Sequence, residues 1–225
     1  MKTQELLEFL KYNGAERAGV CGDAGRLFQR ENSVKGLVIL VRLPVRIAGY
    51  LRSGPYQQYL AACDRMDHNL AEVIRAGIQE LSRNGYRAEG RMTKVPEDMQ
   101  GADILEEDRF LIDCAAAAAG LGWIGKNGRL VVRDFGPVVR SAVILTDAPL
   151  ENTEPETESH CGACRVCIGN CPAGALTGKA WNPGCAEADL ISRAACDALR
   201  AEGVCEKCLG VCTYTQKYMR NGKWY

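Results

Sequence analysis

The sequence predicts an α+β protein in which an N-terminal α/β domain with a mixed sheet is followed by a small cysteine-rich domain. Two observations lead to this prediction. Patterns typical of helices and strands alternate through the first 150 residues, and nine of the twelve cysteines lie between Cys161 and Cys212. Residues 149–159 (PLENTEPETES) are acidic and lack an apolar period, which is typical of an exposed linker. We therefore expect one domain over residues 1–150 and a second over residues 151–225.

Length and charge exclude several classes of protein. The 225 residues suffice to bury a large core, and Lys and Arg total 28, as do Asp and Glu. The balanced charge gives no whole-chain field that favours nucleic acid or an anionic membrane. No apolar run approaches the roughly 20 residues of a membrane span, and the N-terminal pattern is unlike a signal peptide. We expect a cytoplasmic protein with no membrane contact and no clear nucleic-acid surface.

The N-terminal elements follow from hydrophobic spacing. Residues 3–13 have helical spacing and end at Gly14, residues 15–22 (AERAGVCG) predict a short strand, and residues 36–44 (GLVILVRLP) predict a buried strand. Ser53, Gly54 and Pro55 open a long helix that stops at Asn84 and Gly85. A further strand is predicted over residues 141–147 (SAVILTD).

Residues 119–132 (AGLGWIGKNGRLVV) nearly match the phosphate loop GxxxxGK[ST]. Asn127 replaces the hydroxyl that reaches magnesium, and a helix-like run precedes the glycines while a strand-like run follows them, which reverses the order of a phosphate loop. We therefore expect a helix-to-strand turn in which Gly120 caps the helix. The other glycines would let the backbone lie close to a flat chemical group.

The first cysteine run is CGACRVCIGNCP, which has the spacing CxxCxxCxxxCP of bacterial ferredoxins and supplies Cys161, Cys164, Cys167 and Cys171. Zinc sites more often use two separate CxxC pairs. Twelve cysteines in a reducing compartment also favour metal ligation over disulfides. The run predicts a ferredoxin-like domain with two 4Fe–4S clusters.

A second run, CEKCLGVC, supplies Cys205, Cys208 and Cys212. Two clusters need eight thiolates and the two runs provide seven, so Cys196 or Cys185 must be the eighth. Cys196 is favoured because the residues before it have a helical pattern, whereas Cys185 lies in a loop-like segment.

In ferredoxins the cysteine before the proline binds the other cluster. This crossover predicts one cluster held by Cys161, Cys164, Cys167 and Cys212. It predicts a second held by Cys171, Cys196, Cys205 and Cys208.

Several motifs, taken together, resemble a known family. AGLGWIGKNG, FGPVV, AVILTDAPL, HCGACRVCIGNCPAGAL and the late CxxCxxxC are similar to the epoxyqueuosine reductase family, whose members are cobalamin-dependent proteins with two 4Fe–4S clusters and are related to reductive dehalogenases. The resemblance covers about Leu105 to Thr213 and suggests a short, divergent member.

The resemblance implies that the glycine-rich turn lies against a corrinoid. The residues expected to bind this cofactor are Gly120, Gly122, Trp123, Gly125, Lys126 and Asn127. Trp123 could instead be a core aromatic and Lys126 a solvated turn lysine. The DxHxxG corrinoid signature is absent, so no histidine ligand of that type is expected.

The family's VDTxPxLER segment is replaced here by LEEDRFLID, which places Glu106 at the position of the proposed proton donor. Glu106 could deliver a proton if it is buried beside a cofactor, or it could be an exposed acidic residue. The family's longer N-terminal portion and C-terminal repeats have no counterpart in this sequence, which leaves recognition of transfer RNA without an obvious surface.

The sequence therefore predicts an iron–sulfur oxidoreductase that passes electrons through two 4Fe–4S clusters to a bound cobalamin, which reduces a small or nucleoside-like substrate. A low-potential donor such as ferredoxin or flavodoxin would supply the electrons. The alternative is an electron-transfer protein that reduces a partner protein and binds no corrinoid.

Overall fold

The computed structural model describes residues 2–31, 34–53, 55–101, 103–201, 203 and 205–222. The chain divides into two compact units, and each unit is assembled from three separate stretches of the sequence. Unit 1 comprises Met1–Arg42, Asp64–Leu121 and Arg140–Glu156. Unit 2 comprises Leu43–Cys63, Gly122–Val139 and Thr157–Tyr225.

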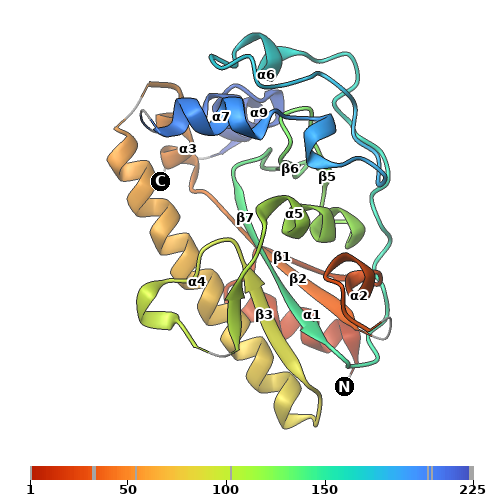
Figure 1. Cartoon of the computed structure of the whole chain (residues 1–225). Helices are drawn as coiled ribbons and strands as arrows, with labels where there is room; N and C mark the ends of the chain where they lie inside the picture. The colour runs from red at the N-terminus through yellow and green to blue at the C-terminus, as the bar shows by residue number, and fades with distance from the viewer. Residues whose placement is uncertain are drawn as a thin grey trace. The chain divides into compact units, whose positions relative to one another are not determined.

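Unit 1 is built on a five-stranded mixed sheet with the order β1-β2-β7-β3-β4 (Figure 1). Its strands are β1 (Arg17–Cys21), β2 (Lys35–Arg42), β7 (Val139–Thr146), β3 (Ala88–Met92) and β4 (Ile104–Glu106). The β1–β2 and β3–β7 pairs are antiparallel, whereas β3 and β4 are parallel. The two long central strands β2 and β7 are almost wholly buried, which agrees with the apolar runs GLVILV and AVIL that they contain.

Helices cover both faces of this sheet. Helices α1 (Thr3–Tyr12) and α4 (Tyr56–Arg83) lie on one face, where Gly77 of α4 leaves room for Ile144 of β7 and Leu10 of α1. Helix α5 (Arg109–Ala118) packs against β1, β2 and β3 on the other face. Figure 1 shows α5 in front of the sheet and α1 behind it. Short elements α2 (Ala24–Leu27) and η1 (Glu97–Met99) complete the unit.

Unit 2 is made of short elements around the cysteines. A hairpin of β5 (Trp123–Ile124) and β6 (Leu130–Val131) is followed by η2 (Glu187–Asp189) and by the helices of the cysteine-rich segment. These helices are α6 (Val166–Gly169), α7 (Arg193–Ala201), α8 (Lys207–Gly210) and α9 (Thr213–Asn221). Helix α3 (Val45–Ser53) packs against α8 and α9 although it lies far from them in the sequence.

The mixed α/β architecture with a mixed sheet is confirmed, as are the predicted elements α1, β1, β2, α4 and β7. The predicted opening of the long helix includes Gly54, which lies outside the described residues. Residues 43–63 and 122–139 belong to the unit that contains the nine clustered cysteines, an association that composition along the chain does not reveal. The linear division into residues 1–150 and 151–225 stays a prediction.

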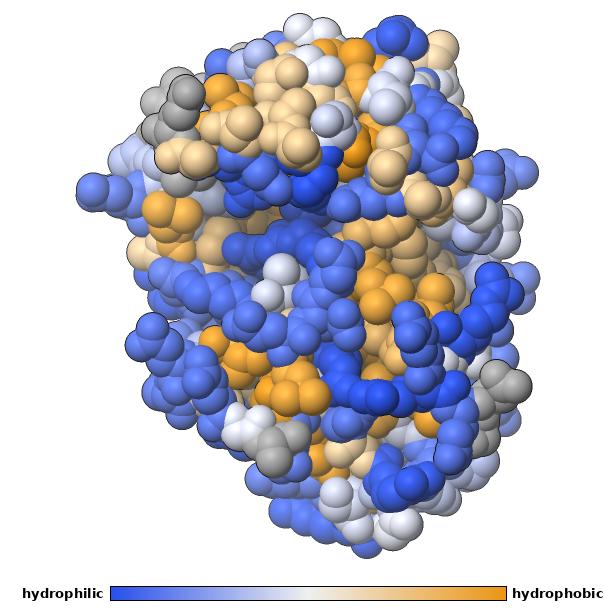
Figure 2. All heavy atoms as spheres, viewed as in Figure 1, coloured by the Kyte–Doolittle hydropathy of each residue, from blue (hydrophilic) through white to orange (hydrophobic). Residues whose placement is uncertain are grey.

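The exposed surface is mainly polar. Figure 2 shows hydrophilic residues over much of the viewed face with apolar areas between them. The large apolar side chains that are most exposed among the described residues are Tyr12, Leu60, Leu105 and Val166. None of the described helices is both long enough and apolar enough to cross a bilayer.

The acidic segment predicted to be a linker is fastened to unit 1. The backbone N–H of Thr153 donates to the carbonyl of Val20 at 3.1 Å, and that of Glu156 donates to the carbonyl of Ala117 at 2.9 Å. The Thr153 hydroxyl accepts a hydrogen bond from the N–H of Val20 at 3.0 Å and donates to the carbonyl of Ala119 at 2.7 Å. One side chain therefore ties this segment to both β1 and the end of α5.

Replacement of Thr153 by Val keeps the shape of the side chain and removes both hydroxyl hydrogen bonds. We expect the free energy of unfolding to fall by about 1–3 kcal/mol, because a half-buried N–H and a carbonyl lose their partner. Chemical denaturation of the variant measures this change. Thr153→Ser, which keeps the hydroxyl, is the control, and a loss in Thr153→Ser with none in Thr153→Val would show that the methyl group matters instead.

Candidate functional site

The glycine-rich turn forms the β5–β6 hairpin of unit 2 and the end of α5 in unit 1. The N–H of Gly125 donates to the carbonyl of Arg129 at 2.9 Å, and the N–H of Gly128 donates to the carbonyl of Gly125 at 2.9 Å. Residues 122–128 are all buried. The predicted helix-to-strand turn is therefore present, and its hairpin portion is enclosed.

The glycines have structural roles within the chain. Gly120 follows α5 with a φ of +70°, the left-handed conformation of a helix cap, and a Cβ there would meet the carbonyl of Glu154. A Cβ on Gly122 would meet the carbonyl oxygen of Val131, and a Cβ on Gly125 would lie 2.7 Å from Oδ1 of Asn127. Close approach of the chain to itself is thus sufficient to explain why glycine occupies these positions.

Trp123 is an interior aromatic residue with 1% of its surface exposed. Its ring makes edge contacts with His160 and Tyr214, each with a centroid distance of 4.9 Å. The guanidinium carbon of Arg133 lies 5.9 Å from the ring centroid. The buried indole N–H has no hydrogen-bond partner in the part of the chain that the structure describes. Trp123 therefore packs against His160, which precedes Cys161, and against Tyr214, which lies two residues after Cys212.

Lys126 and Asn127 are also buried, with 8% and 3% of their surfaces exposed. The Lys126 ammonium donates to the carbonyl of Gly162 at 2.7 Å and to that of Cys164 at 3.2 Å. The side-chain oxygen of Asn127 accepts from the N–H of Arg129 at 3.3 Å, which stabilises the hairpin turn. Lys126 is therefore bound to the first CxxC loop and is not a solvated lysine.

Four thiols converge beside Lys126. A small cavity is lined by Lys126, Asn127, Tyr214 and the side chains of Cys161, Cys164, Cys167 and Cys212. Burial, followed by the proximity of Cys161, Cys212 and Cys164, raises the pKa of the Cys167 thiol to about 11. These four residues are the set expected from the ferredoxin crossover, and here the chain brings them together.

A second group of thiols surrounds a small core of Ala175, Leu176 and Ile191. Cys171, Cys196 and Cys208 pack against this core. Burial, and to a lesser extent the charge of Glu206, raise the pKa of the Cys208 thiol to about 12. Burial also raises the pKa of the Cys196 thiol, on which neighbouring Cys205 acts electrostatically.

Cys185 belongs to neither group. Its Sγ lies 3.9 Å from the carbonyl of Ala180, and it is absent from the cavity lining and from the packed core.

The remaining cysteines lie outside the cysteine-rich segment: Cys21 and Cys63 are buried, and Cys114 is partly buried. Among the residues that the structure describes, no group of three His, Cys, Asp or Glu side chains is arranged to hold a single metal ion.

Glu106 ends strand β4 in unit 1 and is exposed. Its Oε1 accepts a hydrogen bond from the backbone N–H of Val95 at 3.1 Å. Its role as a proton donor stays a prediction, as do the roles of the turn residues in binding a cofactor.

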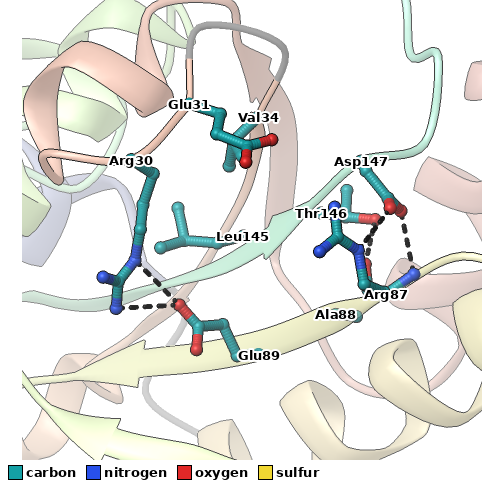
Figure 3. A pocket seen from close by; sticks show the side chains of 9 residues that line it. All are labelled: Arg30, Glu31, Val34, Arg87, Ala88, Glu89, Leu145, Thr146 and Asp147. Carbon is teal, nitrogen blue, oxygen red and sulfur yellow. Dashed lines mark hydrogen bonds and ion pairs between the residues drawn. The ribbon is translucent and has the colours of Figure 1, made fainter.

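A cavity of about 480 Å³ opens in unit 1 and contains none of the predicted site residues (Figure 3). Its two arginines are already paired. Arg30 contacts Glu89 at 3.3 Å, and Arg87 contacts Asp147 at 2.8 Å. The hydrogen bond from Arg87 lowers the pKa of the Asp147 carboxyl. Both cations are thus compensated, whereas the Glu31 carboxylate also lines the cavity and acts electrostatically on Arg87.

Sequence reasoning missed the contact between the hairpin and the cysteine loop. Lys126 and Cys164 are separated by a long stretch of chain, and no local pattern indicates that they meet. Tyr214 offered a weak signal, since it lies two residues after Cys212 and lines the same cavity.

Gly122→Ala should destabilise the protein by about 1–3 kcal/mol, because the added methyl meets the backbone of Val131 whether or not a cofactor is bound. Thermal unfolding of the protein without added cofactor measures the effect. Gly169→Ala is the control, since a Cβ at Gly169 has no atom within 4 Å. A Gly122→Ala variant as stable as the control would show that the hairpin accommodates the methyl.

Curated proteins share part of this sequence, although no family model matches the chain. The epoxyqueuosine reductase of Synechocystis sp. is 32% identical over 113 residues, which are 46% of this chain and 39% of the relative. The chain thus spans well under two thirds of the length of this curated relative.

Solved structures show the same fold. A catabolic reductive dehalogenase, NpRdhA, in complex with 3-bromo-4-hydroxybenzoic acid matches 92% of this chain and 31% of its own, with a TM-score of 0.68 and 18% identity. An epoxyqueuosine reductase with an epoxyqueuosine-modified stem loop of transfer RNA matches 95% of this chain and 65% of its own, with a TM-score of 0.56 and 18% identity.

The expectation of no clear nucleic-acid surface is not supported, because one of these similar proteins was solved with a transfer RNA stem loop. The resemblance to epoxyqueuosine reductases is confirmed by sequence. The mixed α/β fold is shared with both epoxyqueuosine reductase and reductive dehalogenase structures.

Proposed function

We propose that this chain is an iron–sulfur oxidoreductase, similar to epoxyqueuosine reductases, that carries single electrons through two 4Fe–4S clusters. The observation that carries the proposal is the meeting of Cys212 with Cys161, Cys164 and Cys167 around one cavity. A thiol from the second cysteine run thereby completes the set begun by the first run, as in double-cluster ferredoxins.

The first group of thiols suits a cluster better than a single ion. Each of the four thiolates of a 4Fe–4S cluster binds a different iron, so these ligands stand farther apart than those of a tetrahedral zinc ion. Cys161, Cys164, Cys167 and Cys212 would hold the first cluster.

The second group supports a second cluster held by Cys171, Cys196, Cys205 and Cys208. Cys196 lies on α7 and packs with Cys171 and Cys208 around the same small core, whereas Cys185 does not. This packing favours Cys196 as the eighth ligand. Burial keeps the pKa of several of these thiols high, so iron must displace protons when it binds.

The resemblance and the shared fold support the binding of cobalamin, whereas the structure of the glycine-rich turn supports it less. Residues 122–128 are buried, and Lys126 and Asn127 already have partners within the chain. This hairpin therefore does not present a surface that fits a corrinoid. A corrinoid held by the chain would rely on residues outside the hairpin.

The substrate and donor follow from the same resemblance. One similar structure contains an epoxyqueuosine-modified stem loop, which supports a nucleoside-like substrate for a reductase of this kind. The proposed clusters accept one electron at a time, so a one-electron donor of low potential, such as ferredoxin or flavodoxin, suits them.

Two observations favour the second candidate, an electron-transfer protein without its own corrinoid. Five of the six predicted corrinoid contacts are buried, Gly120 being the exception, and the predicted proton donor Glu106 is an exposed side chain that accepts a hydrogen bond from the backbone of Val95. Such a protein would pass electrons to a partner and show no turnover alone.

Measuring the iron content of variants tests whether Cys196 or Cys185 is the eighth ligand. Anaerobically reconstituted wild-type protein should bind about eight irons per chain, since each cluster contains four. Cys196→Ala should lose about half of this iron, whereas Cys185→Ala, the matched control, should keep it. Iron and sulfide assays measure the result, and equal losses would contradict the assignment of Cys196.

A titration with cob(II)alamin decides between the two candidate functions. The full-length, iron-replete protein is titrated anaerobically while the cobalt EPR spectrum is recorded. A saturable change in that spectrum is expected for a corrinoid-dependent reductase. A spectrum identical to that of the free cofactor would support the electron-transfer protein instead.

A further inference from the structure

Lys126 is a buried cation without a carboxylate partner. Only 8% of its surface is exposed, and its ammonium donates to the two carbonyls of Gly162 and Cys164. Among the residues that the structure describes, it forms no ion pair. Neutral carbonyls compensate only part of the cost of removing an ammonium from water.

The proposed function supplies a negative charge that would compensate the Lys126 ammonium. Lys126 lines the same cavity as Cys161, Cys164, Cys167 and Cys212. A 4Fe–4S cluster with four cysteinate ligands is an anion, and one-electron reduction adds a further negative charge to it. The position of the ammonium beside these thiols is therefore the position of a counter-charge to the first cluster.

The same side chain also fixes the shape of the binding loop. Its two acceptors, Gly162 and Cys164, belong to the CGAC segment that supplies the first two ligands. Because the ammonium reaches this loop from the β5–β6 hairpin, it holds the first two thiols against the rest of unit 2. Hydrogen bonds and charges around a cluster are the means by which a protein sets its potential.

We propose that Lys126 is the positioning residue and counter-charge of the first 4Fe–4S cluster, and that it raises the reduction potential of this cluster. Reduction adds one electron to the cluster, and neither a bond nor a proton is exchanged with Lys126. The attraction of the ammonium is larger for the reduced cluster, which carries more negative charge. The inference rests on the proposed pair of clusters.

The test compares Lys126→Met, which removes the charge and keeps an unbranched apolar stem, with Lys126→Arg, which keeps the charge. Lys179→Met is the matched control, because the Lys179 side chain is 49% exposed in the same unit and is paired with Asp189 at 2.8 Å. The full chain is reconstituted anaerobically with iron and sulfide. Redox titration followed by EPR gives the potentials of its clusters, and iron assays give their number.

We expect Lys126→Met to shift the potential of one cluster to a more negative value and to leave the other unchanged. Lys126→Arg should shift it less, and Lys179→Met should shift neither. If Lys126→Met retains both clusters at wild-type potentials, the inference is wrong. If Lys126→Met loses half of its iron, retention by Lys126→Arg supports a need for the charge, and equal loss in both variants overturns it.

A separate outcome concerns the proposed function alone. If reconstituted wild-type protein gives no 4Fe–4S signal, the two clusters themselves are excluded before any variant is compared. Failure of the Lys126 inference with intact wild-type clusters would leave the proposed function standing.

Discussion

The meeting of Cys212 with the first three cysteines is the constraint on which the architecture of unit 2 depends. Cys212 precedes helix α9, so its thiol is placed only if that helix is held. The Tyr218 hydroxyl of α9 donates to the carbonyl of Leu43 at 2.9 Å, and its ring packs edge-on against Phe135 with a centroid distance of 5.6 Å. The two outlying stretches of unit 2, Leu43–Cys63 and Gly122–Val139, therefore support the helix that follows Cys212.

The balance of charge over the whole chain conceals an asymmetry between the units. Unit 2 contains 13 Lys and Arg against 7 Asp and Glu, while unit 1 contains 15 against 21, which together make the 28 of each sign. A cysteine-rich unit with excess positive charge is suited to hold anionic clusters, because its field offsets the charge that they bring. The net charge of the whole chain does not reveal this difference in charge between the two units.

The sequence predicted those elements whose hydrophobic pattern matches their burial. Strands β2 and β7 have continuous apolar runs and were recognised, whereas β3 (AEGRM) has none. Arg91 of β3 is nevertheless buried, because Glu89 pairs with its guanidinium at 2.6 Å. A strand that buries an arginine does not follow the apolar periodicity on which strand prediction relies.

The two cysteine groups were predicted for a different reason. The spacing of thiols within each run is short-range information, and the crossover between the runs follows from the chemistry of double-cluster ferredoxins. The partners of the glycine-rich turn depend instead on contacts between distant segments. Gly120 lies against Glu154, and Lys126 reaches Gly162, which no window of local sequence contains.

A lysine in a glycine-rich turn can compensate the charge of an anion in two ways. In a phosphate loop the glycines expose backbone N–H groups to a ligand that enters from solvent, and the lysine reaches that ligand from the same side. In this chain the hairpin is buried, the glycines admit other parts of the chain, and the ammonium faces a cavity lined by four thiols. Under the proposed function this anion is a cluster assembled inside the protein. The motif then acts together with the cysteines, and its resemblance to a nucleotide-binding loop is superficial.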